Sequence, residues 1–348
     1  MLERALNGVI GGNTAQTEGA INFGVSNPGG INGLTGTGLI RNTKISGSIE
    51  HNVEFYNQSG TLNLTIDGTN PVSEGANPNS AADDVADCAI GFNSVAGGSD
   101  GIQMEMQGTA VATVVIDRCL FRDNKSQPVQ IAANDSSSIT ATIDESFARK
   151  LSQGNEGFVL SNGSNGRLNA RITNNRINNF GGVGIFVGQT PGNANALAGN
   201  AIGLTALIQN NVVNAPITAT NHSIIAALTS TVGQISRANI SIDGNFIDHP
   251  ANGGTTRPFL IDTPDANTTP DWTATVVNNT ITGVDPGLGA SADVTARRGT
   301  ACFDVRNNTV NGTFGLRVRQ AAPGAVQLEQ GVSGSGVATV VVAANNTA

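Results

Sequence analysis

A short phrase built around paired asparagines recurs along the chain, and it limits the possible folds more than any other feature. It occurs as "ITNNRIN", "LIQNNVVNA", "VVNNTITGV" and "VRNNTVNGT", each time with an apolar residue three positions before the second asparagine. Aligning the chain on that position gives repeats 24 to 36 residues apart, anchored at Ile40, Ile66, Ile90, Ile116, Ile143, Ile172, Ile208, Ile242, Val276 and Val305. A period in this range that tolerates insertions is typical of a solenoid, in which each repeat is one coil.

Each repeat contains two strand-like runs. The first leads into the anchor, as in "TATVVI" and "NISID", and the second follows a glycine-rich or polar bend, as in "GIQMEM" and "GIFVGQ". Both alternate apolar with other residues, which is the period of a half-buried strand. Charged residues make up only 13% of the chain and aromatic residues 4%, so charged helices and an aromatic-rich core are not expected. We therefore expect an all-β fold, a right-handed parallel β-helix solenoid of about ten to eleven coils.

The asparagines are expected to form a corner of each coil. In the last five repeats the third position after the anchor is always asparagine, namely Asn175, Asn211, Asn245, Asn279 and Asn308. Asparagine tolerates the left-handed backbone of a sharp bend, and its amide can donate to one neighbouring coil while accepting from the other. Stacked at the strand spacing of about 4.8 Å, these residues would form an internal ladder. A residue that recurs at every turn is better explained by this role than by catalysis.

The chain divides into a short first segment and a long solenoid. Residues 1–35 are expected to form an N-terminal cap or a first partial coil, and residues 36–348 the β-helix. Loop insertions are expected at about 67–87, 189–203 and 262–272, where the repeat lengthens. The end of the sequence, "VATVVVAANNTA", looks like a further coil cut off at its asparagine corner. We expect the chain to be a segment of a longer protein.

Composition excludes several classes of function. A net charge of -8 and a pI near 4.8 argue against a nucleic-acid groove, which needs clustered lysine and arginine. The sequence contains no apolar run of about 18 residues that would span a bilayer. Cys88, Cys119 and Cys302 lie far apart without metal-ligand spacing, so they are interpreted as small buried apolar residues rather than as a zinc site or a disulfide framework.

Beyond the repeat itself, the stretches "GNEGFVLSNGSNG", "GVGIFVGQTPGNA" and "LRVRQAAPGAVQLEQGVSGSG" carry a resemblance. From about residue 36 onward the chain resembles bacterial β-strand-repeat surface proteins with right-handed parallel β-helix regions, a fold shared with pectate lyases. The resemblance implies an extracellular or cell-surface location. The same fold hosts lyases, glycoside hydrolases, epimerases and phage tailspikes, so it does not by itself decide between binding and catalysis.

The sharpest cluster of candidate catalytic residues lies beside two neighbouring anchors. Asp117 and Asp144 each follow an anchor, so they should stand about one strand spacing apart on the outer surface. Glu145, Arg118 and Arg122 are close to them in sequence. Two carboxylates at this separation could hold Ca²⁺, or one could serve as a general acid or base. The alternative is that each aspartate only accepts backbone hydrogen bonds at a strand end.

A second acidic group lies in one of the expected insertions. Asp262, Asp265 and Asp271 are weak candidates for a Ca²⁺ site, because they lack the regular spacing of known calcium-binding β-repeats. A solvated loop is the alternative interpretation. We expect Asp262 to stack beside Arg297 and then Arg319 in the following coils, forming an exposed column of opposite charges.

An outward apolar column is the most suggestive candidate for binding. Val159, Phe186, Ile225 and Leu260 fall at equivalent positions of the second strand in four successive repeats. Together they would make a strip about 15 Å long. Exposed apolar strips of this kind usually contact something. Either the long insertions fold over it, or it meets a protein partner or a second copy of the chain.

Two hypotheses follow from these observations. The first is a non-catalytic structural or adhesive β-helix of a bacterial cell-surface or secreted repeat protein, which needs no cofactor and binds a protein partner, a surface glycan or another copy of itself. Self-association of such a protein would form a stalk or filament. The rival is a polysaccharide-active enzyme, a lyase, hydrolase or epimerase, for which Ca²⁺ would be the cofactor. An enzyme requires a groove in which Asp117 and Asp144 converge with Arg118 or Arg122, whereas an adhesive protein does not.

Overall fold

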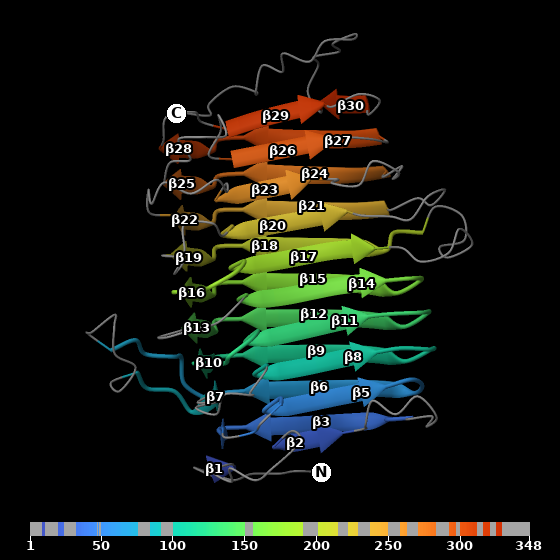
Figure 1. Cartoon of the computed structure of the whole chain (residues 1–348), viewed down its shortest axis with the longest axis vertical. Helices are drawn as coiled ribbons and strands as arrows, with labels where there is room; N and C mark the ends of the chain where they lie inside the picture. Colours follow the sequence, from blue (N-terminus) through green and yellow to red (C-terminus); the bar gives the residue numbers. More distant parts are fainter. Residues whose placement is uncertain are drawn as a thin grey trace.

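The computed structural model shows a solenoid built from three parallel sheets (Figure 1). It describes residues 9–10, 20–23, 33–46, 48, 50–75, 84–91, 100–149, 156–190, 201–214, 222–228, 237–249, 258–262, 271–282, 292–296, 300–311, 316–320 and 325–328. These residues form strands and turns without a helix, and so they include no helical segment that could cross a membrane. The predicted all-β solenoid is confirmed.

Each sheet contains ten strands in chain order. Sheet A consists of the short strands β1 (Val9–Ile10), β4 (Lys44–Ile45), β7 (Cys88–Gly91), β10 (Cys119–Arg122), β13 (Phe147–Arg149), β16 (Arg176–Asn178), β19 (Val212–Asn214), β22 (Phe246–Asp248), β25 (Thr280–Thr282) and β28 (Thr309–Asn311). Sheet B consists of β2 (Ile21–Phe23), β5 (Val53–Asn57), β8 (Ile102–Met106), β11 (Val129–Ala133), β14 (Phe158–Gly163), β17 (Ile185–Thr190), β20 (Ile224–Leu228), β23 (Phe259–Asp262), β26 (Ala292–Ala296) and β29 (Leu316–Gln320). Sheet C consists of β3 (Gly36–Arg41), β6 (Thr61–Asp67), β9 (Val111–Asp117), β12 (Ser138–Asp144), β15 (Arg167–Thr173), β18 (Leu204–Gln209), β21 (Arg237–Asp243), β24 (Asp271–Val277), β27 (Thr300–Arg306) and β30 (Ala325–Leu328).

One coil takes a strand from each sheet in turn, as in β9, β10 and β11. The predicted run into the anchor is the sheet C strand, and the predicted second run is the sheet B strand. Sheet A is a third strand of two to four residues that the alternation did not reveal, because so short a segment has no measurable period. Ten strands in each sheet agree with the predicted number of coils.

The register of sheet C aligns the anchors, with one exception. Ile66 pairs with Ile116, and Ile116 pairs with Ile143. Ile90, which we also took as an anchor, lies instead in β7 of sheet A, between Ile45 and Phe121. The spacings of 24 and 26 residues around it are therefore wrong, because residues 66 to 116 form a single coil that contains an insertion.

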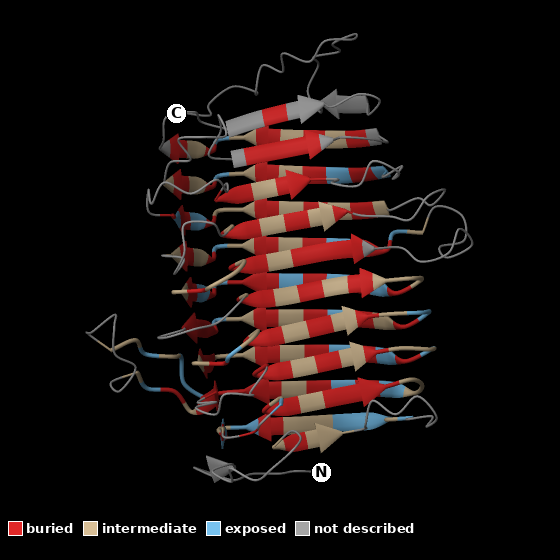
Figure 2. Ribbon diagram, viewed as in Figure 1, coloured by how far each residue is buried: buried red, intermediate tan, exposed pale blue. Residues whose placement is uncertain are grey.

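Alternation along the strands fills the interior with aliphatic side chains (Figure 2). In β9 and β12 every second residue is buried, and the inward side chains of all three sheets join in one continuous core. Trp272 is the largest fully enclosed side chain, and its ring packs edge-on against Phe303 at a centroid distance of 4.9 Å. Each coil covers the apolar edge of its neighbour, so no coil is expected to be stable alone.

The expected segment boundaries can be compared with the strands. Within residues 1–35, β1 and β2 pair in parallel with β4 and β5 and belong to the first coil. The insertion at 67–87 begins where β6 of sheet C ends and finishes where β7 of sheet A begins. The middle parts of the insertions at 189–203 and 262–272 lie outside the described residues.

Candidate functional site

The second asparagine of each pair is buried in a hydrogen-bonded ladder at the corner of the helix. The Nδ2 of Asn211 donates to the carbonyl oxygen of Ile172, at 2.8 Å, and to Oδ1 of Asn245, at 3.0 Å. Its Oδ1 accepts from the backbone N–H of Asn175 at 3.0 Å. Equivalent contacts join all five ladder residues, each at most 1% exposed: Asn175, Asn211, Asn245, Asn279 and Asn308. The ladder therefore satisfies buried polar groups coil after coil.

The first asparagine of each pair makes the bend. The φ angle is between 55° and 58° at Asn174, Asn210, Asn278 and Asn307, and all four residues are exposed. Asparagine is one of the few residues that adopt this left-handed conformation at low cost. The bend and the ladder, which we expected from a single residue, are thus divided between two. This division explains why the asparagine is doubled.

Other residues occupy these two positions in earlier coils. Ser146 continues the ladder, because its N–H donates to Oδ1 of Asn175 at 2.9 Å and its Oγ accepts from the N–H of Cys119 at 3.1 Å. The bend position is held by Arg118 and Glu145, with φ angles of 52° and 44°. Two residues that we considered for catalysis therefore sit where the backbone conformation is unfavourable for their side chains.

Replacing Glu145 by asparagine is expected to stabilise the protein. The Glu145→Asn variant should raise the free energy of unfolding by about 1 kcal/mol, because asparagine adopts the left-handed conformation more readily. Glu145 is exposed, so the change loses little packing. Urea denaturation measures the difference, and the reverse change, Asn174→Glu, should destabilise by more than about 1 kcal/mol, because it also removes the hydrogen bond that Asn174 donates to Asp144. A Glu145→Asn variant that is less stable than the wild type would show that glutamate has a stabilising contact there.

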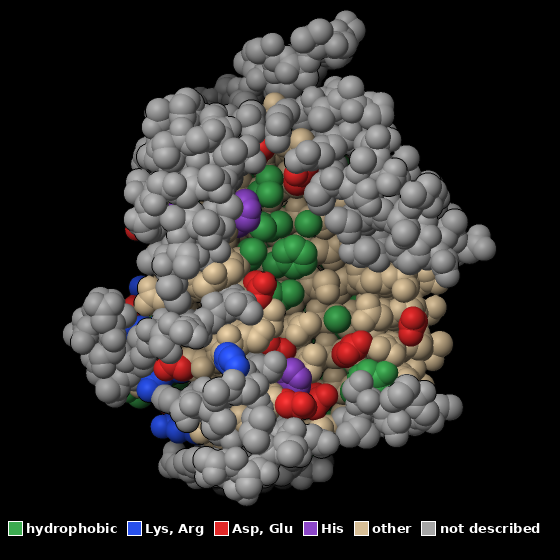
Figure 3. All heavy atoms as spheres, viewed as in Figure 1, with side chains coloured by type: hydrophobic (Ala, Val, Ile, Leu, Met, Phe, Trp, Pro, Cys, Tyr) green, Lys and Arg blue, Asp and Glu red, His purple; other side chains and the backbone are tan. Residues whose placement is uncertain are grey.

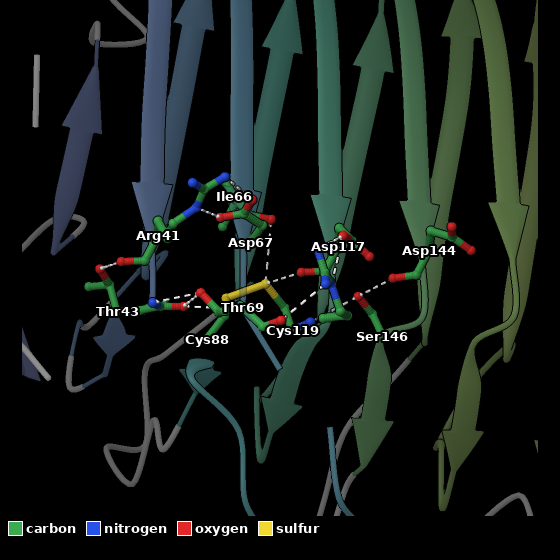
Figure 4. Close-up of a disulfide and its surroundings, with 12 residues drawn as sticks. Arg41, Thr43, Ile66, Asp67, Thr69, Cys88, Asp117, Cys119, Asp144 and Ser146 are labelled. Carbon is green, nitrogen blue, oxygen red and sulfur yellow. Dashed lines mark hydrogen bonds and ion pairs between the residues drawn. A yellow bond between two sulfur atoms is a disulfide. The ribbon is translucent and has the colours of Figure 1, made fainter. Parts of the chain in front are cut away.

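A disulfide joins Cys88 to Cys119, which corrects our interpretation of both residues as unlinked (Figure 4). The two cysteines start β7 and β10 and are direct partners in the register of sheet A, with their Cα atoms 4.7 Å apart. Cys119 occupies the ladder position, so the disulfide continues the column of Asn175 and Ser146. We missed this pair because treating Ile90 as an anchor placed Cys88 in a different column. Cys302 lies in β27 of sheet C and is half-buried.

Three aspartates stand side by side at the end of sheet C (Figure 4). Asp144 is the register partner of Asp117, as predicted, and Asp117 is the partner of Asp67. Neighbouring aspartates are therefore about 4.8 Å apart along the axis of the solenoid. All three lie one residue before the corner, where sheet C ends.

Each of these carboxylates is engaged by a neighbouring side chain. Asp67 accepts two hydrogen bonds from Arg41, at 2.7 and 2.8 Å, and these bonds, aided by the charge of the aspartate, raise the pKa of Arg41. Asp117 binds the guanidinium of Arg118 at 2.6 and 2.8 Å. The column is thus internally neutralised at two of its three positions.

Asp144 completes the column, and its hydrogen-bond partners among the described residues are uncharged. Its Oδ1 accepts from Thr173 Oγ1 at 2.6 Å and from Asn174 Nδ2 at 2.9 Å. Asn174 is the bend residue of the following coil, so this carboxylate fastens one corner to the next. The alternative that we gave for this aspartate, a hydrogen-bond acceptor at a strand end, describes these contacts, although the donors are side chains rather than the backbone.

Arg122 does not join the aspartates in the way that the enzymatic alternative requires. Arg122 lies in β10 of sheet A, on the far side of the corner, and its register partner is Arg149. Burial lowers the pKa of Arg122, and the neighbouring charges of Asp123 and Asp84 oppose this shift. Arg149 forms a fully buried ion pair with Asp84 at 2.9 Å. The corner of the chain thus separates Arg122 from Asp117, although only four residues lie between them in sequence.

The insertion that follows β6 folds across the outer face of sheet A. An antiparallel bridge between Ser73 and Val85 closes its base, and Asp84 carries the ion pair with Arg149. Glu74 binds Arg176 at 2.7 Å, in β16, three strands beyond β7 in sheet A. Beneath the insertion lies a small apolar cluster of Val72, Ala86, Ala89, Leu120 and Phe147. The described part of the insertion therefore contacts sheet A from β7 to β16 and leaves sheet B as a separate outer face.

The proposed calcium loop is not assembled among the described residues. Asp262 ends β23 in sheet B and is 5% exposed, whereas Asp271 begins β24 in sheet C and lies 3.7 Å from Arg237. Asp265 lies outside the described residues. The part of the chain that the structure describes contains no group of three or more metal-binding side chains.

The expected neighbours of Asp262 also need correction. Its register partner in the next coil is Thr295, and Arg319 follows Thr295. Arg297, which we placed beside Asp262, lies outside the described residues. The error arose because β26 begins after a long connection whose length the alternation does not determine.

The apolar column on sheet B is in register as predicted. Val159 pairs with Phe186, Phe186 with Ile225, and Ile225 with Leu260. All four side chains are half-buried, and they are called the sheet B strip below. Figure 3 shows hydrophobic side chains at the surface in the middle of this face. The ring of Phe186 lies over Gly188, because a Cβ at Gly188 would approach two of its ring carbons to 2.5 and 2.6 Å.

Acidic and amide side chains frame the sheet B strip. The same column reads Glu54, Gln103 and Gln130 before the strip and Asp293, which is fully buried, after it. The adjacent outward column contains Glu105 before the strip and Asp262 at its end. Strands β5 to β26 of sheet B contain neither lysine nor arginine. We did not identify this acidic frame from the sequence, although the outward positions of the second run would have revealed it.

Comparisons with protein-family models, with curated proteins and with solved structures found no match to the chain. The function therefore has to be argued from the two surfaces described above, the neutralised acidic corner and the sheet B strip.

Proposed function

We propose that the chain is a non-catalytic structural or adhesive β-helix of a bacterial cell-surface or secreted repeat protein. The observation that carries the proposal is the sheet B strip, four half-buried apolar side chains in successive coils on an outer face. Soluble proteins seldom leave such a strip at the surface unless it contacts a partner. This function requires a binding partner, which is a protein, a surface glycan or a second copy of the chain.

The corner of the helix supports an extracellular or cell-surface location. Disulfides persist in oxidising compartments and are rare in the cytosol. The Cys88–Cys119 bond is buried and aligned with the asparagine ladder, so it reinforces the same corner that the ladder holds. A scaffold fastened in this way suits a protein that has to persist outside the cell, where refolding is not assisted.

The contacts of the acidic corner favour this function over the rival one. A polysaccharide-active enzyme would use a carboxylate that can approach the substrate and exchange a proton with it. Arg118 binds Oδ2 of Asp117, and Thr173 and Asn174 donate to Oδ1 of Asp144, so both carboxylates are held by structural contacts at the strand end. Arg122 lies in a different sheet and cannot complete the group.

Adhesion and turnover can be measured on the same preparation. Beads coated with the purified chain are expected to be retained on films of collagen or chitin in larger numbers than on an albumin-coated film. The same beads are expected to release no soluble saccharide from chitin or polygalacturonate in the presence of Ca²⁺. Retention on none of the films would count against the proposal. Release of saccharide that is lost in Asp144→Asn would establish the enzymatic alternative instead.

A further inference from the structure

We propose that the N-terminal end of the solenoid contains a binding site for a small neutral aromatic molecule. The site is a cavity of about 240 Å³ between sheets B and C, at the level of β2 and β3 (Figure 1). It lies apart from the sheet B strip, and the adhesive function does not use it. The apolar side chains that line it include Phe23, Leu34, Ile40, Phe55, Leu62 and Leu64.

The cavity exists because β3 lacks two inward side chains. Gly36 and Gly38 are the register partners of Leu62 and Leu64, whose side chains are buried in the next coil. In every sheet C strand from β6 to β27 both of these positions carry a side chain, from alanine to tryptophan. The glycines therefore remove packing from the core at the level of β3, and a ligand that fills the space would restore those contacts.

Hydrogen bonds and ring stacking hold the walls of the cavity in place. Asn57 is fully buried; its Oδ1 accepts from the N–H of Leu34 at 2.8 Å, and its Nδ2 donates to the carbonyl oxygen of Leu34 at 3.1 Å. The rings of Phe23 and Phe55 are stacked, with their centroids 5.0 Å apart and their planes 9° from parallel. The cavity is thus formed before a ligand enters, which lowers the cost of binding.

The lining determines the chemistry of the ligand. No charged side chain occurs among the described residues that line the cavity, so a charged molecule would lose its hydration without gaining a partner. An apolar cavity of about 150 Å³ stays dry and binds benzene. The present cavity is larger, which gives room for a molecule of one or two rings. Phe23 and Phe55 favour an aromatic ligand, because aromatic rings prefer to pack against one another by stacking or by edge contacts.

Calorimetric titration with indole tests the proposal. Indole is neutral and has two fused rings, and it should bind the wild-type chain at one saturable site. Gly38→Leu places a side chain in the cavity and should weaken binding at least about tenfold. A Cβ at Gly38 would lie 3.1 Å from Cδ1 of Leu64, the end of a flexible side chain, so the substitution can be accommodated. Thr113→Leu, the matched control, adds the same side chain on the exposed face of sheet C and should change the affinity by less than about twofold.

Thermal unfolding without indole shows whether the variants remain folded. Gly38→Leu should melt at a temperature no lower than the wild type, because it fills a cavity. Gly38→Val, with a smaller side chain, should bind indole with intermediate affinity, and it replaces Gly38→Leu in the comparison if the leucine variant does not fold. Absence of binding to the wild type, or equal binding to the wild type and the folded Gly38 variants, would overturn the proposal. Beads coated with Gly38→Leu should be retained on films as well as wild-type beads, so this inference and the adhesive function can fail separately.

Discussion

Asn211→Ala is expected to lower the free energy of unfolding by about 4 kcal/mol, one of the two largest effects that we expect from small substitutions. The side chain of Asn211 takes part in four hydrogen bonds, with Ile172, Asn245 and both the backbone and the side chain of Asn175. Alanine would leave the carbonyl of Ile172 and the N–H of Asn175 without these partners in the interior. Each unsatisfied buried group costs about 1–3 kcal/mol.

Urea denaturation measures the cost, and the neighbouring asparagine supplies the control. Asn210→Ala removes an exposed side chain from the bend and should cost about 1 kcal/mol, because alanine adopts the left-handed conformation less readily. Asn211→Ser should be intermediate, since a hydroxyl keeps the acceptor role that Ser146 already plays. A ladder is contradicted if the Asn210 and Asn211 alanine variants are equally stable.

Loss of the disulfide is the second large effect. The double variant Cys88→Ala, Cys119→Ala should be less stable than the wild type by about 3 kcal/mol, because the bond closes a loop between residues 31 apart. Thermal unfolding with and without reductant measures this difference. Reductant should lower the melting temperature of the wild type and of Cys302→Ala alike, and leave the double variant unchanged. Three titratable thiols in the unreduced, unfolded wild type would contradict the bond.

Much of the fold could be predicted because its signals are local. The asparagine phrase repeats within each coil, and alternation within a strand separates inward from outward residues. The assignment of Ile90 failed because "AIGFN" resembles the anchor phrase, while its place in sheet A depends on pairing with Ile45 and Phe121. Sequence pattern alone does not reveal that a strand begins a different sheet after an insertion.

For the candidate sites too, the local pattern predicts which residues are neighbours but not which contacts they make. The adjacency of Asp117 and Asp144 and the alignment of the sheet B strip follow from alternation and coil spacing. Their environments do not, because Arg118 reaches Asp117 only through the left-handed bend at residue 118. Likewise, Arg122 points away from the acidic corner because that bend redirects the chain into sheet A. Contacts set by the direction of a turn could not be read from spacing.

The polar column of sheet B was within reach of the sequence. Alternation within the second run places Glu54, Gln103 and Gln130 in line with the strip.

Bead retention compared between Phe186→Ser and Asp144→Asn tests the central claim, that the sheet B strip and not the acidic corner is the functional surface. Both variants are first checked by thermal unfolding, and retention is then measured on the film that best holds the wild type. We predict that Phe186→Ser loses most of the retention while Asp144→Asn keeps it. Full retention by Phe186→Ser together with loss in Asp144→Asn would contradict the claim and move the functional surface to the corner.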